Sequence, residues 1–248
     1  MGLHVLRPTL APSFAFAIAL LATSPAAPAD APEGGHGADA ALFEATSRHD
    51  FADVEHWQKV FDDPARDEWQ KPDLVIEKLA LREGMRVADL GAGTGYFSRY
   101  LSGAVGRTGT VYAVETEPAL VTHLRDRAET EGSDNLIPVL ASSADSRLPL
   151  FGIDLVLLVD TFHHIDDRLA YFTDARRRLR PAGRVAVIDW KKKELPVGPG
   201  LHHKIAREQV VEEMKRAGYE LSDESTALPY QYFLIFRPRS LPAADRSD

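Results

Sequence analysis

The chain has 248 residues, of which 44% are hydrophobic and 27% charged, and its formal net charge is −8. This composition is ordinary for a globular protein with one sizeable core. Basic residues do not outnumber acidic ones, which argues against general nucleic-acid binding. The absence of cysteine excludes disulfides and a lipoprotein attachment site.

The N-terminus has the form of a secretory signal. Arg7 precedes an apolar run at residues 14–22 that is too short to span a bilayer, and residues 27–29 form an A-x-A cleavage site. We therefore expect residues 1–29 to be a signal peptide, which implies a periplasmic or secreted protein with no stable membrane insertion after processing. The alternative is an uncleaved extension on a cytoplasmic protein.

Two further segments precede the core. Residues 30–42, rich in glycine, alanine and proline, are predicted to form a flexible leader. Residues 43–72 are predicted to form an N-terminal helical segment, because Trp57 and Phe61 fall at helical spacing. The prolines and acids of residues 62–72 are expected to break that helix.

A short apolar strand, residues 87–90, leads into three alternating glycines, Gly91, Gly93 and Gly95. Apolar residues at helical spacing follow, so the glycines lie in a strand-to-helix turn. Glycine lets the backbone bend sharply and lets a ligand approach closely. The free N–H groups of the following helix point at whatever fills the turn.

The charge near this turn indicates which ligand it holds. A dinucleotide fingerprint would need glycine where the chain has Tyr96. Asp89, before the first glycine, would repel a pyrophosphate and hold a cationic ligand. Glu115 ends a second buried strand, residues 110–115, and is suitably placed to accept hydrogen bonds from ribose hydroxyls.

This order of strand, glycine turn and acids resembles the class I S-adenosylmethionine-dependent methyltransferases, in their small-molecule, quinone-biosynthesis-like group. The resemblance covers residues 73–238. It implies an α/β, Rossmann-like fold: a seven-stranded, mostly parallel sheet with helices on both faces and an antiparallel last strand. It also implies S-adenosylmethionine as cofactor and a small molecule as methyl acceptor. The cofactor-binding residues that it implies are Asp89, Gly91, Gly93, Gly95, Glu115, Ala144, Asp145 and Asp160.

The candidate catalytic residues lie at the end of the predicted fourth strand, residues 154–160, and just after it. They are Asp160, His163 and His164, and a histidine there has two interpretations. It is a general base on the acceptor, since its pKa lies near neutrality, or it is part of the pocket wall. Asp160 and Asp189 also suggest a divalent metal, but Trp190 and Lys191 stand where a partner ligand would be, so we expect no metal.

In related enzymes the segment before the first core helix folds over the cofactor. Trp57, Trp69 and Gln70 therefore either close the site and exclude water or pack a helix on the sheet. Near the C-terminus, residues 207–217 are predicted to be a helix, residues 219–221 and 230–236 the last strands, and residues 239–248 a disordered tail.

Two alternative functions remain open: an aminopropyl transferase of the same fold, and a non-catalytic, exported nucleoside-binding module. The sequence does not fix the oligomeric state or the acceptor.

Overall fold

The computed structural model describes residues 51–239. The predicted signal peptide at residues 1–29 and the leader at residues 30–42 lie outside the described residues. So does the tail after residue 239.

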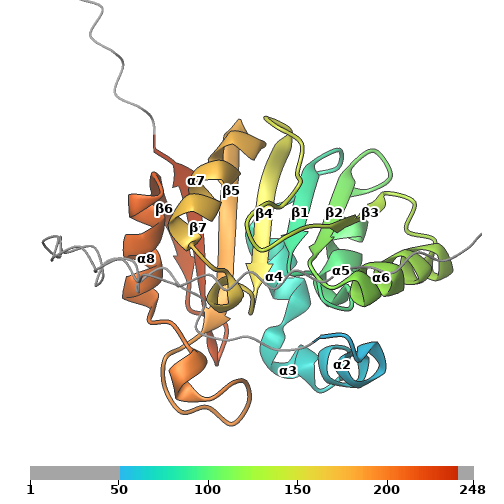
Figure 1. Cartoon of the computed structure of the whole chain (residues 1–248), viewed down its shortest axis with the longest axis horizontal. Helices are drawn as coiled ribbons and strands as arrows, with labels where there is room; N and C mark the ends of the chain where they lie inside the picture. Colours follow the sequence, from blue (N-terminus) through green and yellow to red (C-terminus); the bar gives the residue numbers. More distant parts are fainter. Residues whose placement is uncertain (1–50, 240–248) are drawn as a thin grey trace, which may run out of the picture. The chain divides into compact units, whose positions relative to one another are not determined.

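The core is a seven-stranded sheet with the order β3-β2-β1-β4-β5-β7-β6 (Figure 1). Strands β1 to β5 are parallel to one another, and β7 is antiparallel to both β5 and β6. The predicted fold class is therefore confirmed. The strands are β1 (Arg86–Leu90), β2 (Thr110–Glu115), β3 (Leu136–Leu140), β4 (Ile153–Val159), β5 (Leu179–Trp190), β6 (Tyr219–Ser225) and β7 (Gln231–Pro238).

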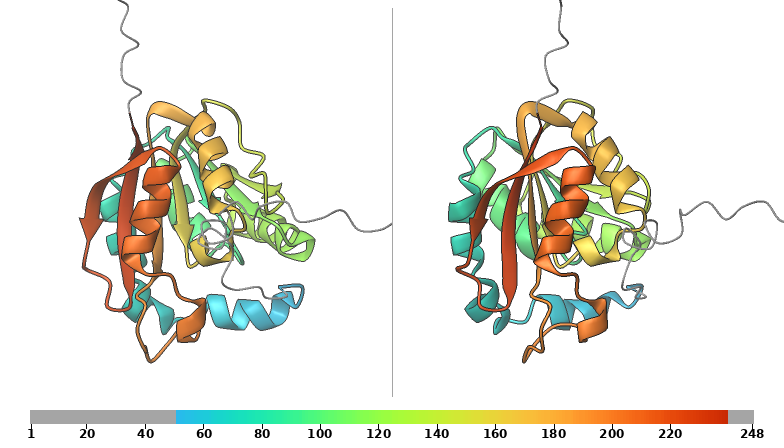
Figure 2. Two further views of the ribbon diagram at one scale, coloured as in Figure 1. Left: turned by 60° about the vertical axis from the view of Figure 1, so that its left-hand side comes forward. Right: turned by 90° about the vertical axis from the view of Figure 1, so that its left-hand side faces the viewer.

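Helices cover both faces of this sheet (Figure 2). The central strand β4 shows why, because its side chains point alternately to two apolar clusters. Val156 and Leu158 pack with one cluster, and Leu155 and Leu157 pack with the other. The first cluster includes side chains of α7 (Arg168–Arg178) and α8 (Arg207–Arg216), and the second includes side chains of α4 (Pro72–Leu79) and α5 (Tyr96–Val105). The helix α6 (Pro118–Glu131) packs on β2 and β3.

Short helices lie beside the carboxyl ends of the parallel strands (Figures 1 and 2). They are α2 (Val54–Phe61) and α3 (Arg66–Gln70), which lead into α4. The predicted helix does end at Phe61, but the expected break over residues 62–72 is wrong in part, because it contains α3. Asp67 and Glu68 lie in the first turn of α3, where acidic side chains stabilise a helix.

Strand β5 begins at Leu179, and its register with β4 shifts between Ile153 and Leu155. Two other sequence predictions need adjustment. The predicted helix at residues 207–217 ends at Arg216, and Gly218 follows its C-cap with φ +89°. Strand β6 continues to Ser225, beyond its predicted end.

Within residues 51–239, no helix combines the length and the apolar character that crossing a bilayer requires.

Candidate active site

The glycine turn joins β1 to α5 in a conformation that side chains rarely adopt. Gly91, Gly93 and Gly95 have φ values of +72°, +57° and +89°. A Cβ on Gly91 would lie 2.4 Å from the side chain of Thr161, which follows β4. Glycine is required at Gly91 because both the backbone conformation and the close approach to Thr161 exclude a side chain.

Asp89 lies at the end of β1 beneath this turn. Its carboxylate is buried and accepts a hydrogen bond of 2.6 Å from the Ser98 hydroxyl in α5. Burial raises the pKa of Asp89 to about 6, although the Ser98 hydrogen bond and the Arg66 charge oppose the rise. Burial deprives the ionised carboxylate of its hydration, which destabilises the charged form. A cationic ligand beside Asp89 would stabilise that charged form, so the site favours a cation.

Glu115 ends β2 on the other side of the glycine turn. Its carboxylate accepts hydrogen bonds from the backbone N–H of Gly93 at 2.9 Å and of Thr116 at 2.6 Å. The side chain is therefore fixed beside the turn, and carboxylate oxygens with several lone pairs accept further hydroxyl donors.

Ala144 and Asp145 lie in the loop after β3, and both are exposed. The Asp145 carboxylate is 3.2 Å from the Arg178 guanidinium and accepts a hydrogen bond from the backbone N–H of Arg147 at 2.8 Å. Asp145 is therefore oriented by the protein's own charges, and its contact with a nucleobase stays a prediction.

Asp160 follows β4 with a φ of +54°, a backbone conformation that non-glycine residues adopt at some energetic cost. Its side chain is only 17% exposed and lies 3.8 Å from the guanidinium of Arg66 in α3. Burial, and then the neighbouring Asp189, raise the pKa of Asp160 to about 7. The ionised form of Asp160, like that of Asp89, is therefore destabilised by burial and would be stabilised by a cationic ligand.

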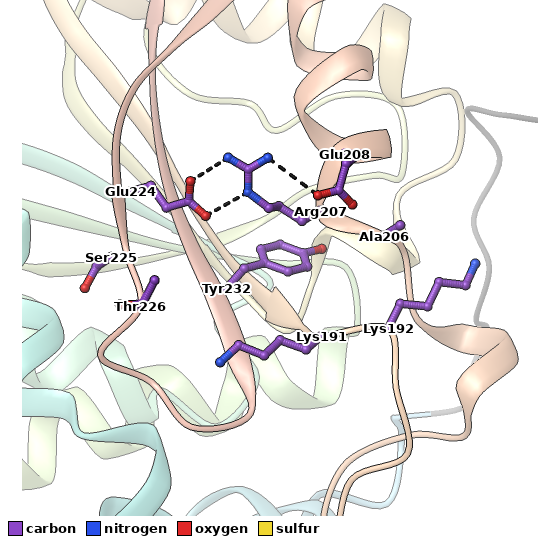
Figure 3. A pocket seen from close by; sticks show the side chains of 9 residues that line it. All are labelled: Lys191, Lys192, Ala206, Arg207, Glu208, Glu224, Ser225, Thr226 and Tyr232. Carbon is purple, nitrogen blue, oxygen red and sulfur yellow. Dashed lines mark hydrogen bonds and ion pairs between the residues drawn. The ribbon is translucent and has the colours of Figure 1, made fainter.

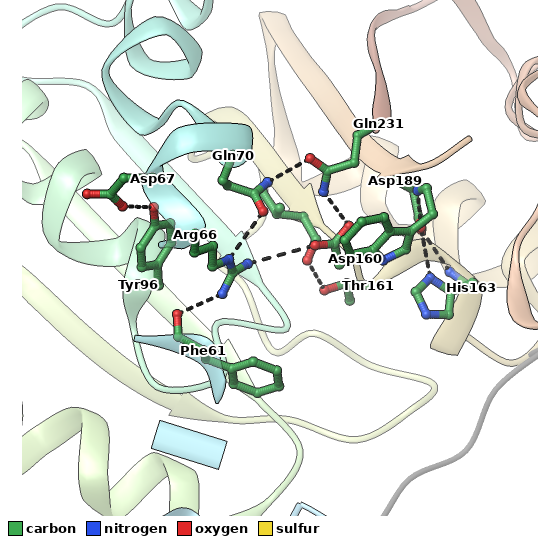
Figure 4. Close-up of polar contacts among 12 residues, drawn as sticks. Phe61, Arg66, Asp67, Gln70, Tyr96, Asp160, Thr161, His163, Asp189 and Gln231 are labelled. Carbon is green, nitrogen blue, oxygen red and sulfur yellow. Dashed lines mark hydrogen bonds and ion pairs between the residues drawn. The ribbon is translucent and has the colours of Figure 1, made fainter. Parts of the chain in front are cut away.

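His163 is buried and lies in a short 3-10 turn, Phe162–His164, after β4. Its ring Nδ1 is 2.9 Å from one oxygen of the buried Asp189, at the end of β5 (Figure 4). Burial lowers the pKa of His163, but the Asp189 charge and hydrogen bond, together with Asp160, outweigh burial and raise it. The ring of His164 lies 4.2 Å from that of His163. The structure therefore brings Asp160, His163 and Asp189 together at the ends of β4 and β5.

The segment that contains α2 and α3 is held over the glycine turn. The ring of Phe61 lies close to Gly93: a Cβ added at Gly93 would be 3.3 Å from the nearest ring carbon. Asp62 forms an ion pair of 2.9 Å with Arg127 of α6, and Arg127 also donates to the Thr94 carbonyl at 2.9 Å. The segment thus covers the candidate site, which favours the lid interpretation of these residues.

Arg66 was missed by the sequence analysis. Its guanidinium donates to the Phe61 carbonyl at 2.9 Å and lies 4.4 Å from the ring centroid of Tyr96. Burial lowers the pKa of Arg66, while Asp160 and Tyr96 oppose this change. One arginine among the many charges of residues 62–72 has no distinguishing motif, so only the fold reveals its position.

Metal coordination finds no support in the described part of the chain, where no cluster of three or more histidine, aspartate and glutamate side chains is arranged to hold an ion. Gln231 donates to Asp160 at 2.6 Å, and the backbone N–H of Trp190 donates to Asp189 at 2.8 Å. Both acids are thus engaged within the protein.

A separate pocket of about 340 Å³ lies between β5, α8 and the β6–β7 hairpin (Figure 3). Tyr232 lines it together with Lys191 and Lys192, and its Arg207 is paired with Glu224 at 2.5 Å. None of the predicted cofactor or catalytic residues lines this pocket. It is therefore distinct from the candidate site.

Comparison with known proteins agrees with this geometry. The family model described as "Methyltransferase domain" matches residues 88–187, which span the region from the glycine turn to β5. The crystal structure of a SAM dependent methyltransferase from Aquifex aeolicus has a TM-score of 0.71 and 27% sequence identity, and the match covers 76% of this chain and 98% of that chain. The matched part of this chain is therefore similar in sequence and fold to the S-adenosylmethionine-dependent methyltransferases.

Two curated relatives of this chain have assigned activities. The ubiquinone/menaquinone biosynthesis C-methyltransferase UbiE of Laribacter hongkongensis is 29% identical over 126 residues, 50% of this chain and 51% of that protein. A protein-L-isoaspartate O-methyltransferase of Methanothrix thermoacetophila is 29% identical over 114 residues, 46% of this chain and 51% of that protein. The chain thus spans about half the length of the curated relatives it matches.

Proposed function

We propose that this protein transfers a methyl group from S-adenosylmethionine to a small-molecule acceptor. The observation that carries the proposal is the set of acids at the carboxyl ends of three parallel strands: the buried Asp89 in β1 and Glu115 in β2, and the partly buried Asp160 after β4. In a class I methyltransferase fold, this edge of the sheet is the expected ligand site.

The residues present fit this cofactor. Asp89 and Asp160 carry pKa values raised by burial, so both are stabilised by a cationic group such as a sulfonium or an ammonium. Glu115 is suited to accept hydrogen bonds from ribose hydroxyls, and Gly91 allows a close backbone approach. A pyrophosphate-containing cofactor would meet three carboxylates instead of a cationic site.

When bound, S-adenosylmethionine supplies an electrophilic methyl group on a positively charged sulfur. The chain's own residues then have three tasks: Asp89 and Glu115 orient the bound molecule, the segment of α2 and α3 excludes water, and His163 holds a proton beside Asp189. Because the Asp189 contact raises the pKa of His163 and so favours its protonated ring, orientation of the acceptor is its proposed role rather than proton abstraction.

We propose that the acceptor is flat and apolar. Rings from α2, from Phe51 just before it and from the turn after β4 gather beside the site. The ring centroids of Phe51 and Trp57 are 4.7 Å apart, those of Trp57 and Phe61 5.1 Å, and those of Phe51 and His164 5.8 Å. Aromatic surfaces of this kind favour planar ligands. The Laribacter hongkongensis relative is a ubiquinone/menaquinone biosynthesis C-methyltransferase, which supports the same class of acceptor.

Calorimetry with S-adenosylmethionine, S-adenosylhomocysteine and NAD tests the cofactor assignment. We expect binding of the first two and none of NAD. Binding of NAD alone, or of none of the three, would contradict the proposal.

A further inference from the structure

Four side chains form a closed ring of polar contacts between the lid helix α3, the end of β4 and the start of β7 (Figure 4). Arg66 Nε donates to Gln70 Oε1 at 3.2 Å, and Gln70 Nε2 donates to Gln231 Oε1 at 3.1 Å. Gln231 Nε2 donates to Asp160 Oδ1 at 2.6 Å. The Arg66 guanidinium lies 3.8 Å from the other Asp160 oxygen and completes the ring.

The direction of every hydrogen bond in this ring follows from Asp160. An ionised carboxylate only accepts, so Gln231 must turn its NH₂ group toward it. The carbonyl of Gln231 then faces Gln70, whose own carbonyl faces Arg66. Both glutamines are fully buried, so an amide turned the wrong way would leave polar groups unpaired.

The charged groups around Asp160 come from several elements. Asp189 from β5 opposes its ionisation, while Arg66 from α3 and His163 from the turn after β4 favour it. The hydrogen bond from Gln231 also favours the charged form. Tyr232 from β7, whose pKa is raised by burial and then by Asp189 and Asp160, stays neutral. These opposing effects leave the pKa of Asp160 at about 7, so a modest change near this carboxyl decides its charge at neutral pH.

We propose that Gln231 is a positioning residue that keeps Asp160 ionised and aimed into the cofactor site, and that Gln70 links the same carboxylate to the lid. This inference rests on the proposed function, because it assumes that Asp160 contributes to binding a cationic cofactor. Gln231 lies in β7, outside the residues 88–187 that the family model matches, and Gln70 lies before them.

The experiment measures the dissociation constant of S-adenosylmethionine from pH 5.5 to pH 9 by calorimetry, using the whole chain. Wild-type affinity should fall on the acidic side with a midpoint near the Asp160 pKa of about 7. In Gln231→Met the midpoint should rise by about one pH unit, because a hydrogen bond to the charged form is lost. The matched control is Gln58→Met, an exposed glutamine of α2, which should keep the wild-type midpoint.

Two further variants complete the test. Gln231→Glu places another carboxyl beside Asp160 and should also raise the midpoint, so it replaces Gln231→Met if that variant does not fold. Gln70→Met leaves Gln231 in contact with Asp160 but removes the hydrogen bond that joins Gln231 to the lid, so that within this ring only Arg66 still joins α3 to Asp160. The three tryptophans of the chain, Trp57, Trp69 and Trp190, all lie in the lid or beside it, so their fluorescence reports on closure. Gln70→Met should therefore reduce the fluorescence change that S-adenosylmethionine produces.

The outcomes separate this inference from the proposed function. If the wild type binds S-adenosylmethionine and every Gln231 variant that folds keeps the wild-type midpoint of the pH dependence, the role proposed for Gln231 is wrong. The proposed function then still stands. If Gln70→Met shows the full fluorescence change, the link to the lid is wrong. If the wild type does not bind S-adenosylmethionine at any pH, the proposed function itself fails.

Discussion

The Asp189 carboxylate binds His163 twice, accepting from its backbone N–H at 3.3 Å and contacting its ring Nδ1 at 2.9 Å. Both residues are buried, so this contact fixes the position of the ring and keeps Nδ1 occupied by Asp189. Only Nε2 can then exchange a proton with a substrate. The pair resembles a general base with its orienting acid in form, but the raised pKa of His163 favours the protonated ring.

The first prediction separates these two roles. We expect His163→Gln to lower turnover only about tenfold, because an amide still donates a hydrogen bond, and to leave cofactor affinity unchanged. Steady-state kinetics with the natural acceptor, together with calorimetry on the same sample, measures both quantities. A general base would give a loss of about two to four orders of magnitude confined to kcat.

His164→Gln is the neighbouring control. Its ring packs against Phe51, with 5.8 Å between the ring centroids. We expect a loss of similar size for this variant. A much steeper loss for His163 alone would show that the Asp189 contact serves proton transfer.

Local patterns were sufficient to predict the sheet and the glycine turn. The strand that ends at Asp89 and the glycines after it form one continuous motif, so a reader of the sequence can place them. The acids Glu115 and Asp160 each end a buried apolar run, and parallel strands bring such ends to one edge.

Contacts between distant residues could not be predicted in this way. Gln70 and Gln231 are 161 positions apart and neither belongs to a periodic pattern. The helix α3 was missed because Pro64 and the acids near it signal a break. Pro64 in fact lies just before the helix, where proline is tolerated. Arg66 therefore reaches the site through a helix that local pattern assigned to a loop.

The second prediction concerns the acids of the cofactor site. Asp89→Asn and Glu115→Ala should each weaken S-adenosylmethionine binding by more than tenfold, because each removes a charge-assisted contact of roughly 1.5–3 kcal/mol. Calorimetry gives the affinities, and Glu220→Ala on the exposed side of β6 serves as a control for net charge. Unchanged affinity in both site variants would remove the support for the cofactor assignment.

The third prediction uses two glycines of the same region. Gly91→Ala should destabilise the fold by roughly 1–3 kcal/mol and impair cofactor binding, because its φ is +72° and its Cβ would collide with Thr161. In Gly103→Ala, within α5, the new Cβ meets nothing within 4 Å, so this variant should bind as the wild type does. Thermal unfolding and calorimetry compare the two. Equal behaviour would mean that the turn is not under steric constraint.

The fourth prediction is that methyl transfer survives chelation. Asp160 and Asp189 are engaged by Gln231 and His163, and Lys191 follows directly after Trp190 at the end of β5, where a positive charge repels a cation. Activity measured with and without EDTA should therefore agree. Complete inactivation that magnesium reverses would show that a divalent ion takes part.

The fifth prediction concerns stability and pH. The carboxyl of Asp89 has a pKa of about 6 in the folded protein, against an ordinary value of 3.8. Between these two values the folded state holds a proton that the unfolded chain has lost, so raising the pH through this window lowers the stability of the fold. Above about pH 6 the buried carboxylate is ionised and its cost is complete, roughly 1–3 kcal/mol.

Asp89→Asn should remove this cost, since the carboxamide carries no charge and its oxygen can still accept from Ser98. Without ligand, the variant should unfold at a temperature a few degrees above that of the wild type at pH 8, and the difference should shrink toward pH 5. Differential scanning calorimetry of the two proteins at both pH values isolates Asp89, because the other titrating groups are common to both. A variant that is more stable without ligand and binds the cofactor worse would mean that Asp89 is kept for binding at the expense of stability. A variant less stable than wild type at pH 8, or a difference independent of pH, would contradict the burial argument.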